Sequence, residues 1–353
     1  MPKATRSVDD RAVKSAKCVV WDLDDTLWHG TLSADDDVTL KDGVLDLLRT
    51  LDSRGILLSI ASKNNHDDAM RKLTELGIAE YFLHPQISWN SKSSSVAEIQ
   101  KRLNIGIDTF LFIDDQPFER DEVAFALPEV ETVDALDYRT LATLPRLTPP
   151  VVTEDARRRR LMYLDDERRH ESELAYQGPR EDFLRELGMV FGISGAGGDD
   201  LLRLEELTKR TSQLNSTGIH YSYEQIERLM RDPHHDLWVC ELTDRYGSYG
   251  KIGMALVEKG RDRWTIKLLL MSCRTVSKGV GTVLLSFLVK RAAEAETRLF
   301  ADFRRTPRNR QMLLTYQLAN FRVASQDGDD YTYENDLTVS QGYPEYIKVE
   351  VNA

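Results

Sequence analysis

The stretch VVWDLDDTLW, residues 19–28, decides the fold of this chain. Its apolar start, extended by Cys18, has the unbroken hydrophobicity of a parallel strand that is covered on both faces. The run stops at Asp22 and Asp24, which are followed by Thr26. Because open α/β sheets bind ligands beyond the carboxyl ends of their strands, we expect both carboxylates to face one pocket. A capped loop that happens to contain acidic residues is the alternative at this point.

Two further apolar runs predict neighbouring strands of the same sheet, and both end in polar side chains. Residues 56–61 lead into Ser62, Lys63 and Asn64, and residues 110–113 lead into Asp114 and Asp115. Amphipathic patterns predict helices at 42–54, 67–76 and 93–103, the last of them directly after Lys92.

The predicted sheet edge therefore collects four carboxylates, one hydroxyl and one amine, from Asp22, Asp24, Asp114, Asp115, Ser62 and Lys92. Hard oxygen ligands in that number suit Mg²⁺, which prefers carboxylates and substrate phosphate oxygens. A carboxylate beside a metal can attack phosphorus while a neighbouring acid protonates the leaving oxygen. The sequence thus predicts magnesium-dependent phosphoryl chemistry.

This set of motifs resembles the signature of the haloacid dehalogenase (HAD) phosphatase superfamily. The resemblance implies that Asp22 is the nucleophile and Asp24 the general acid and base. It further implies a phosphate site formed by Thr26, Ser62, Lys63, Asn64 and Lys92, and a magnesium site formed by Asp22, Asp24, Asp114 and Asp115. Receiver domains also have an acidic cluster, but there the acidic pair and the phosphorylated aspartate lie on different strands. The D-x-D-x-T spacing argues against that reading.

The chain leaves no room for a large cap domain over this site. The gap between Asp22 and Ser62, and the gap between Ser62 and Lys92, each hold one helix and its connections. HAD enzymes that act on free metabolites usually insert a cap at one of these two points. We therefore expect a site that is open enough to admit a macromolecule or to be covered by another domain.

Length and composition set the wider frame. With 353 residues the chain is long enough for two domains that each bury a core. Its net charge of −11 argues against nucleic acid or an anionic membrane as a partner, and no apolar run approaches the roughly 18 residues of a membrane span. The three cysteines form no disulfide framework, and the first residues form no apolar signal segment. We expect a cytoplasmic protein.

The domain organisation follows from changes in composition along the chain. Residues 1–16 read as a polar lead-in, residues 17–145 as the HAD-like domain, and residues 146–190 as a linker with helices. The linker contains four consecutive arginines at 157–160; acidic neighbours favour a solvated helix there over a phosphate site.

Residues 191–353 read as a second α/β domain. Strands are expected at 237–242, 252–258, 265–271 and 298–303, and helices at 280–293 and from about 309. The order of strand, glycine turn at Gly279 and Gly281, helix and strand resembles the GNAT acyltransferase fold. The expected fold class is therefore α/β: a Rossmann-like HAD domain without a large cap, followed by a GNAT-like domain.

Cys273 is the candidate nucleophile of this second domain. It follows a strand, precedes a glycine-opened helix, and has Arg274 and Lys278 close by in sequence. A helix N-terminus and adjacent cations favour a thiolate over a thiol. A small buried apolar residue is the usual alternative for a cysteine, and it is our reading of Cys18 and Cys240.

Three segments together resemble the FkbH-like proteins of polyketide pathways: VWDLDDTLW, LTKRTSQLNST at 207–217, and LMSCRTVSKGV around Cys273. The resemblance covers about residues 17–325. It implies removal of phosphate from 1,3-bisphosphoglycerate, a glyceryl thioester on Cys273, and delivery of the glyceryl unit to an acyl carrier protein. Arg274, Gln213, Asn215 and His220 would then contact substrate or orient the thiol, although for Asn215 and the Ser and Thr residues of this run a turn and N-cap role is at least as good an explanation.

Two other functions remain open. One is a magnesium-dependent phosphatase of a phosphorylated protein, with the second domain as a docking module. The other is a scaffold without catalysis, whose expected mark, the loss of Asp22 or Asp24, is absent.

Overall fold

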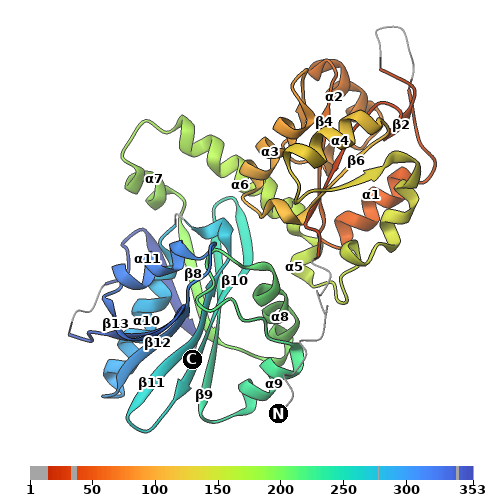
Figure 1. Ribbon diagram of the computed structural model, residues 1–353. Coiled ribbons are helices and arrows are strands. Elements are labelled where there is room, and N and C mark those ends of the chain that lie inside the picture. Colours follow the sequence, from red (N-terminus) through yellow and green to blue (C-terminus); the bar gives the residue numbers. More distant parts are fainter. Residues whose placement is uncertain (1–14, 33–37, 277, 339–341, 353) are drawn as a thin grey trace, which may run out of the picture. The chain divides into compact units, whose positions relative to one another are not determined.

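The computed structural model describes residues 15–32, 38–276, 278–338 and 342–352. Its internal contacts divide the chain into two compact units, residues 1–164 and 165–353, and each unit has its own sheet (Figure 1). The division falls inside helix α6 (Arg159–Ala175), within the stretch expected to hold a linker and helices. The lead-in expected at 1–16 lies almost wholly outside the described residues.

The sheet of the first unit is parallel throughout, with the order β5-β4-β1-β6-β7. Its strands are β1 (Cys18–Trp21), β4 (Leu57–Ser62), β5 (Gln86–Ile87), β6 (Phe110–Asp114) and β7 (Glu131–Asp134). The three strands expected from the sequence are the central three, and β1 lies between the other two. The carboxyl ends of all three therefore meet at one edge, as predicted.

Helices cover both faces of this sheet, because successive residues of its strands point to opposite sides. Val19 and Trp21 belong to one buried cluster, and Cys18 and Val20 to the other. Helices α1 (Val44–Ser53) and α2 (His66–Glu75) pack on the first face, and α3 (Lys92–Leu103) and α4 (Pro117–Ala126) on the second. The shorter elements are η1 (Ala79–Tyr81), η2 (Ile107–Thr109), η3 (Ala135–Thr143), η4 (Pro145–Leu147) and α5 (Glu154–Arg157).

No large cap is present among the described residues of this unit. Between β1 and β4 they form only a two-stranded hairpin, β2 (Trp28–His29) with β3 (Thr39–Leu40), and helix α1. Between β4 and α3 they form α2, η1 and β5. Among the described residues, neither of these two connections therefore holds an inserted cap domain.

The second unit is built on an eight-stranded, mostly antiparallel sheet with the order β13-β14-β12-β11-β10-β9-β8-β15. Its strands are β8 (Met189–Gly195), β9 (His235–Asp244), β10 (Gly247–Lys259), β11 (Arg263–Met271), β12 (Arg298–Arg304), β13 (Phe321–Asp327), β14 (Asp330–Asn335) and β15 (Ile347–Asn352). Only β11 with β12, and β8 with β15, pair in parallel. The four strands expected from the sequence are β9 to β12.

Helices again cover both faces (Figure 1). Helices α10 (Val280–Glu294) and α11 (Arg310–Leu318) pack on one face, and α8 (Leu201–Arg210) and α9 (Tyr223–Arg231) on the other. The remaining elements are α7 (Arg180–Glu186), η5 (Gly198–Asp200) and η6 (Cys273–Thr275). The predicted α/β fold class is confirmed, and no helix among the described residues is long and apolar enough to cross a membrane.

Strands β11 and β12 pair only over their first halves, where residues 263–266 face residues 298–301. Beyond that point a segment from elsewhere in the chain lies between them. Ser216 donates its backbone N–H to the Leu269 carbonyl on β11 and accepts the Arg304 N–H on β12, both at 2.9 Å. The Met271 N–H donates to the Leu214 carbonyl at 2.9 Å. Residues 214–216 therefore close the gap between the two strands.

Candidate functional sites

The acidic residues expected at the edge of the first sheet lie together there. Asp22 and Asp24 follow β1, Asp114 ends β6, and Asp115 comes next. Lys92, the first residue of α3, is 3% exposed and lies among them. The parallel order of the strands produces this arrangement, because it places three strand ends side by side.

Lys92 bridges two of the carboxylates. Its Nζ donates to Asp22 Oδ1 at 2.5 Å, to Asp114 Oδ2 at 2.9 Å and to the Ala61 carbonyl at 3.0 Å. Burial disfavours the charge of Lys92, but the charges of the two aspartates outweigh this effect and raise the lysine pKa. Burial raises the pKa of Asp22, and the charge of Asp114 adds to it while Lys92 opposes it. The lysine is thus held protonated, as a charge-neutralising role requires.

Three carboxylates can hold a divalent metal ion. One oxygen each from Asp22, Asp114 and Asp115 lies within 4.8 Å of the others. Burial and the charge of Asp114 raise the pKa of Asp115, and the three carboxylates of this group outnumber the Lys92 ammonium, which pairs with two of them, Asp22 and Asp114. This surplus of hard, anionic oxygen ligands fits Mg²⁺. The Asp24 side chain, also expected to bind the metal, is not part of this group.

The Asp24 carboxylate is instead held by three N–H donors. Its Oδ1 accepts from the Trp28 indole Nε1 at 2.9 Å and from the Leu32 backbone N–H at 3.0 Å. Its Oδ2 accepts from the Asn64 amide at 2.9 Å. Asn64, which we predicted to bind phosphate, therefore contacts the predicted general acid. No sequence pattern indicated a role for Trp28.

The other residues of the predicted phosphate site have distinct partners. The Thr26 hydroxyl accepts the Asp115 backbone N–H at 3.0 Å, so the motif threonine orients the acidic pair. Lys63 Nζ forms an ion pair of 2.6 Å with Glu119 of α4, and the glutamate offsets the charge of the lysine. Ser62 is buried at the end of β4. Thr26 and Ser62 thus lie at the carboxyl ends of β1 and β4, and the Lys63 side chain is paired with α4.

Cys273 differs from the other two cysteines in its surroundings. It begins the short turn η6 after β11 and is partly exposed, whereas Cys18 and Cys240 are fully buried. Burial raises the pKa of both buried thiols, which keeps them protonated and unreactive. This agrees with our reading of those two cysteines as core residues.

The Arg274 side chain turns into the protein. Its Nη2 donates to the Tyr249 carbonyl at 2.7 Å, and its Nη1 lies 3.9 Å from Asp166 of α6. Burial raises the pKa of Asp166, while Arg274, Arg169 and Lys278 oppose that shift. Arg274, expected to contact substrate, therefore anchors the Cys273 turn to α6.

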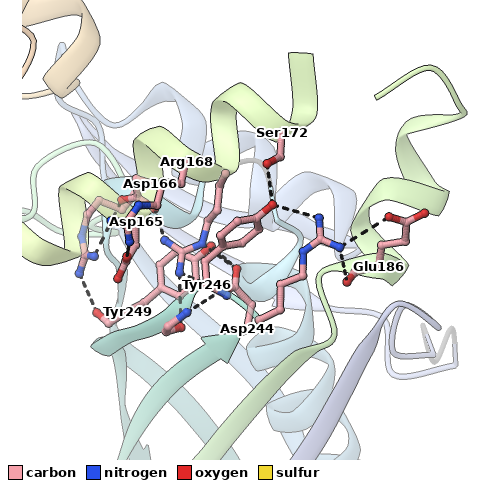
Figure 2. A network of polar contacts seen from close by, with 12 residues as sticks. Asp165, Asp166, Arg168, Ser172, Glu186, Asp244, Tyr246 and Tyr249 are labelled. Carbon is pink, nitrogen blue, oxygen red and sulfur yellow. Dashed lines mark hydrogen bonds and ion pairs between the residues drawn. The ribbon is translucent and has the colours of Figure 1, made fainter. Parts of the chain in front are cut away.

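Figure 2 shows the larger network of which Asp166 and Tyr249 are part. Arg169 of α6 binds both carboxylate oxygens of Asp244, with Nε and Nη2 at 2.7 and 2.8 Å. The guanidinium lies 3.8 Å from the centre of the Tyr249 ring, whose hydroxyl donates to Asp244 at 3.0 Å. The exposed fractions of the Arg169 and Asp244 side chains are 3% and 0%. Charge and stacking thus fasten α6 to the β9–β10 hairpin.

Arg169→Met is expected to lower the free energy of unfolding by about 3 to 5 kcal/mol, because it leaves the Asp244 charge buried without its main partner. Urea denaturation would measure the change. Arg168→Met is the matched control on the same helix, since that side chain is 66% exposed and, among the described residues, forms an ion pair with Asp165 alone. Its effect is expected to stay below about 1 kcal/mol. Equal losses in the two variants would contradict the structural role of Arg169.

The three polar residues expected near the thiol are placed differently from one another. Asn215 is fully buried, and its Oδ1 accepts the backbone N–H groups of Thr217 and Gly218 at 3.1 and 2.8 Å. This is the turn role that the sequence left open as the alternative. Gln213 is half-buried, and His220 is exposed. A small cavity beside the start of α10 is lined by Leu214, Met271, Thr275, Gly279, Gln311 and Thr315, among others.

Residues 28–122 match the family model for haloacid dehalogenase-like hydrolases. The N-terminal part of protein BF1531 from Bacteroides fragilis, which contains a phosphatase domain complexed with Mg, is 30% identical, with a TM-score of 0.33 over 38% of this chain. The match spans only 41% of that protein's chain. No match is found among curated proteins.

Two other solved structures resemble separate parts of the chain. A HAD-superfamily hydrolase from Ehrlichia chaffeensis is 15% identical, with a TM-score of 0.31 over 37% of this chain and 98% of its own. The ribosomal-protein-S18-alanine N-acetyltransferase from Escherichia coli is 16% identical, with a TM-score of 0.32 over 41% of this chain and 90% of its own. The family match and the geometry of the acidic site agree, and the chain therefore contains a haloacid dehalogenase-like hydrolase domain.

Proposed function

We propose that this protein is a glyceryl transferase and phosphatase. It takes 1,3-bisphosphoglycerate, removes its phosphates, carries the glyceryl group as a thioester on Cys273, and loads it onto an acyl carrier protein for polyketide biosynthesis. The observation that supports the phosphatase half is the group of Asp22, Lys92 and Asp114 at an uncapped sheet edge. The transferase half rests on the partly exposed Cys273 and on the resemblance of its surrounding sequence.

The phosphatase residues have separate tasks. An Asp22 oxygen bonds to phosphorus as the bond from phosphorus to the ester oxygen breaks, and Asp24 gives its proton to that leaving oxygen. Water then attacks the phosphorus of the phosphoaspartate, Asp24 takes up a proton from it, and the bond from phosphorus to the Asp22 oxygen breaks as phosphate leaves. Lys92 offsets negative charge on Asp22 throughout. When bound by Asp22, Asp114 and Asp115, Mg²⁺ would neutralise charge on the phosphate oxygens.

The transferase step needs one nucleophile from this protein. The Cys273 thiolate attacks the carbonyl of the acyl phosphate, so that a carbon–sulfur bond forms, the bond to the phosphate oxygen breaks, and phosphate leaves. The thiol of the carrier's pantetheine arm then attacks the thioester, takes the acyl group, and its proton returns to Cys273. The start of α10 and its neighbouring cavity lie beside the same turn and offer space for a narrow arm.

Incubating the protein with Mg²⁺, 1,3-bisphosphoglycerate and an acyl carrier protein tests this proposal. We expect intact-mass spectra to show a glyceryl adduct first on this protein and then on the carrier. Omitting Mg²⁺ and adding a chelator is expected to stop phosphate release from the ester position. A carrier that stays unmodified while phosphate accumulates would overturn the transferase assignment.

The lack of a cap among the described residues also favours a second candidate function. The HAD-like domain would remove phosphate from a phosphorylated protein, and the second unit would serve for docking. In that case a phosphoprotein loses phosphate in the same assay, and no adduct appears on Cys273 at any time.

A further inference from the structure

Asp24 is contacted by donors from three places in the first unit. Trp28 lies in β2, Leu32 follows that strand, and Asn64 follows β4. All three bonds fall between 2.9 and 3.0 Å. Trp28 is fully buried and Asn64 is 7% exposed, so packing holds both side chains. The carboxylate is therefore fixed in rotation as well as in position.

The two oxygens of Asp24 are used unequally. Each carboxylate oxygen can accept two hydrogen bonds. Among the described residues, Oδ1 already accepts two, from the Trp28 indole and the Leu32 backbone, while Oδ2 accepts one, from the Asn64 amide. Only Oδ2 keeps a lone pair that can carry a proton without displacing one of these donors.

We propose that Trp28 and Asn64 are positioning residues for Asp24, and that they assign its proton to Oδ2. This inference rests on the phosphatase half of the proposed function. As the phosphorus–oxygen bond to the leaving group breaks, the proton on Oδ2 moves to the leaving oxygen, and Oδ2 later accepts the proton of the attacking water. Trp28 acts through Asp24 and does not touch the substrate.

A substitution that disturbs the acid should matter most when the leaving oxygen is basic, because a good leaving group departs without a proton. The test compares kcat/KM for alkyl phosphates and for 4-nitrophenyl phosphate, since kcat/KM excludes later hydrolysis of the phosphoaspartate. We expect Trp28→Phe and Asn64→Leu to lower kcat/KM for alkyl phosphates by about 10- to 100-fold. The value for 4-nitrophenyl phosphate is expected to fall by no more than about 3-fold.

Trp21→Phe is the matched control. Trp21 is also fully buried in the first unit, and its indole nitrogen has no hydrogen-bond partner among the described residues. If both tryptophan variants lose activity by the same factor on every substrate, the effect is one of packing and the proposal is wrong.

A second measurement does not depend on turnover. The chain has five tryptophans, and the indole N–H signal of Trp28 is the one missing from the nitrogen-15 NMR spectrum of Trp28→Phe. We expect Asp24→Ala to shift this signal and leave that of Trp21 in place. An unmoved Trp28 signal would overturn the inference. Absence of phosphatase activity in the unaltered protein, with the shift observed, would instead count against the proposed function alone.

Discussion

Asp22→Asn is expected to abolish phosphate release from the ester position, with a loss on the order of 10⁴-fold or more, as is typical when a covalent nucleophile is removed. The amide has nearly the same shape as the carboxylate but cannot form the bond to phosphorus. Lys92 keeps its second partner, Asp114, at 2.9 Å, so its charge stays compensated. Phosphate release measured with an alkyl phosphate and Mg²⁺ checks the result.

The matched control for Asp22 is Asp46→Asn on α1. That side chain is 85% exposed and its one ion pair among the described residues is a surface pair with Arg49, so full activity is expected. Thermal unfolding of both variants separates a chemical effect from a folding defect. If folded Asp22→Asn released phosphate within about tenfold of the unaltered protein, Asp22 would not be the nucleophile.

Cys273→Ala is expected to remove the covalent glyceryl adduct completely and with it all loading of the carrier. The physical reason is that Cys273 is the partly exposed thiol, while Cys18 and Cys240 are buried and protonated. Hydrolysis of 4-nitrophenyl phosphate is expected to continue, because it needs only the first unit. Intact-mass spectra after incubation with 1,3-bisphosphoglycerate provide the measurement.

Cys240→Ala serves as the control for this experiment. Its thiol lies in the core of the second sheet, so the substitution can lower stability but is expected to leave the adduct in place. An adduct of the same mass on folded Cys273→Ala would show that another residue carries the acyl group. Loss of the adduct in both variants, with both folded, would contradict the assignment as well.

The position of the acidic site could be predicted from sequence because it depends on where the strands end, and the strand ends are visible in short stretches of sequence. Each of the three central strands is a short apolar run that ends in polar residues, and parallel pairing brings such ends together whatever the intervening helices do. The placement of Asp22 and Asp114 followed from this rule, whereas Lys92 reaches the same edge from the first residue of α3. The rule specifies where a side chain starts but not which way it turns, so the contacts of Asp24 with Trp28 and Asn64 could not be read from it.

Other contacts depend on partners far away in the chain. The arginine run at 157–160 was read as a solvated helix, but this was wrong for Arg159, which is 7% exposed and donates to the Gly55 carbonyl at 2.9 Å. Arg160 likewise pairs with Asp52. In the second unit the partners of Arg169 and Arg274 lie on other strands and helices. Pairings of this kind leave no periodic signal in the sequence.

The segment at residues 214–216 has a consequence for how the second sheet tolerates change. Its backbone forms hydrogen bonds to both β11 and β12 beyond the point where these two strands stop pairing with each other. Strand β11 is the one that leads to Cys273. The strand that precedes the Cys273 turn is therefore held by a stretch encoded well upstream. A protein engineer who shortened that stretch would loosen the thiol's support without altering any neighbour of the thiol in sequence.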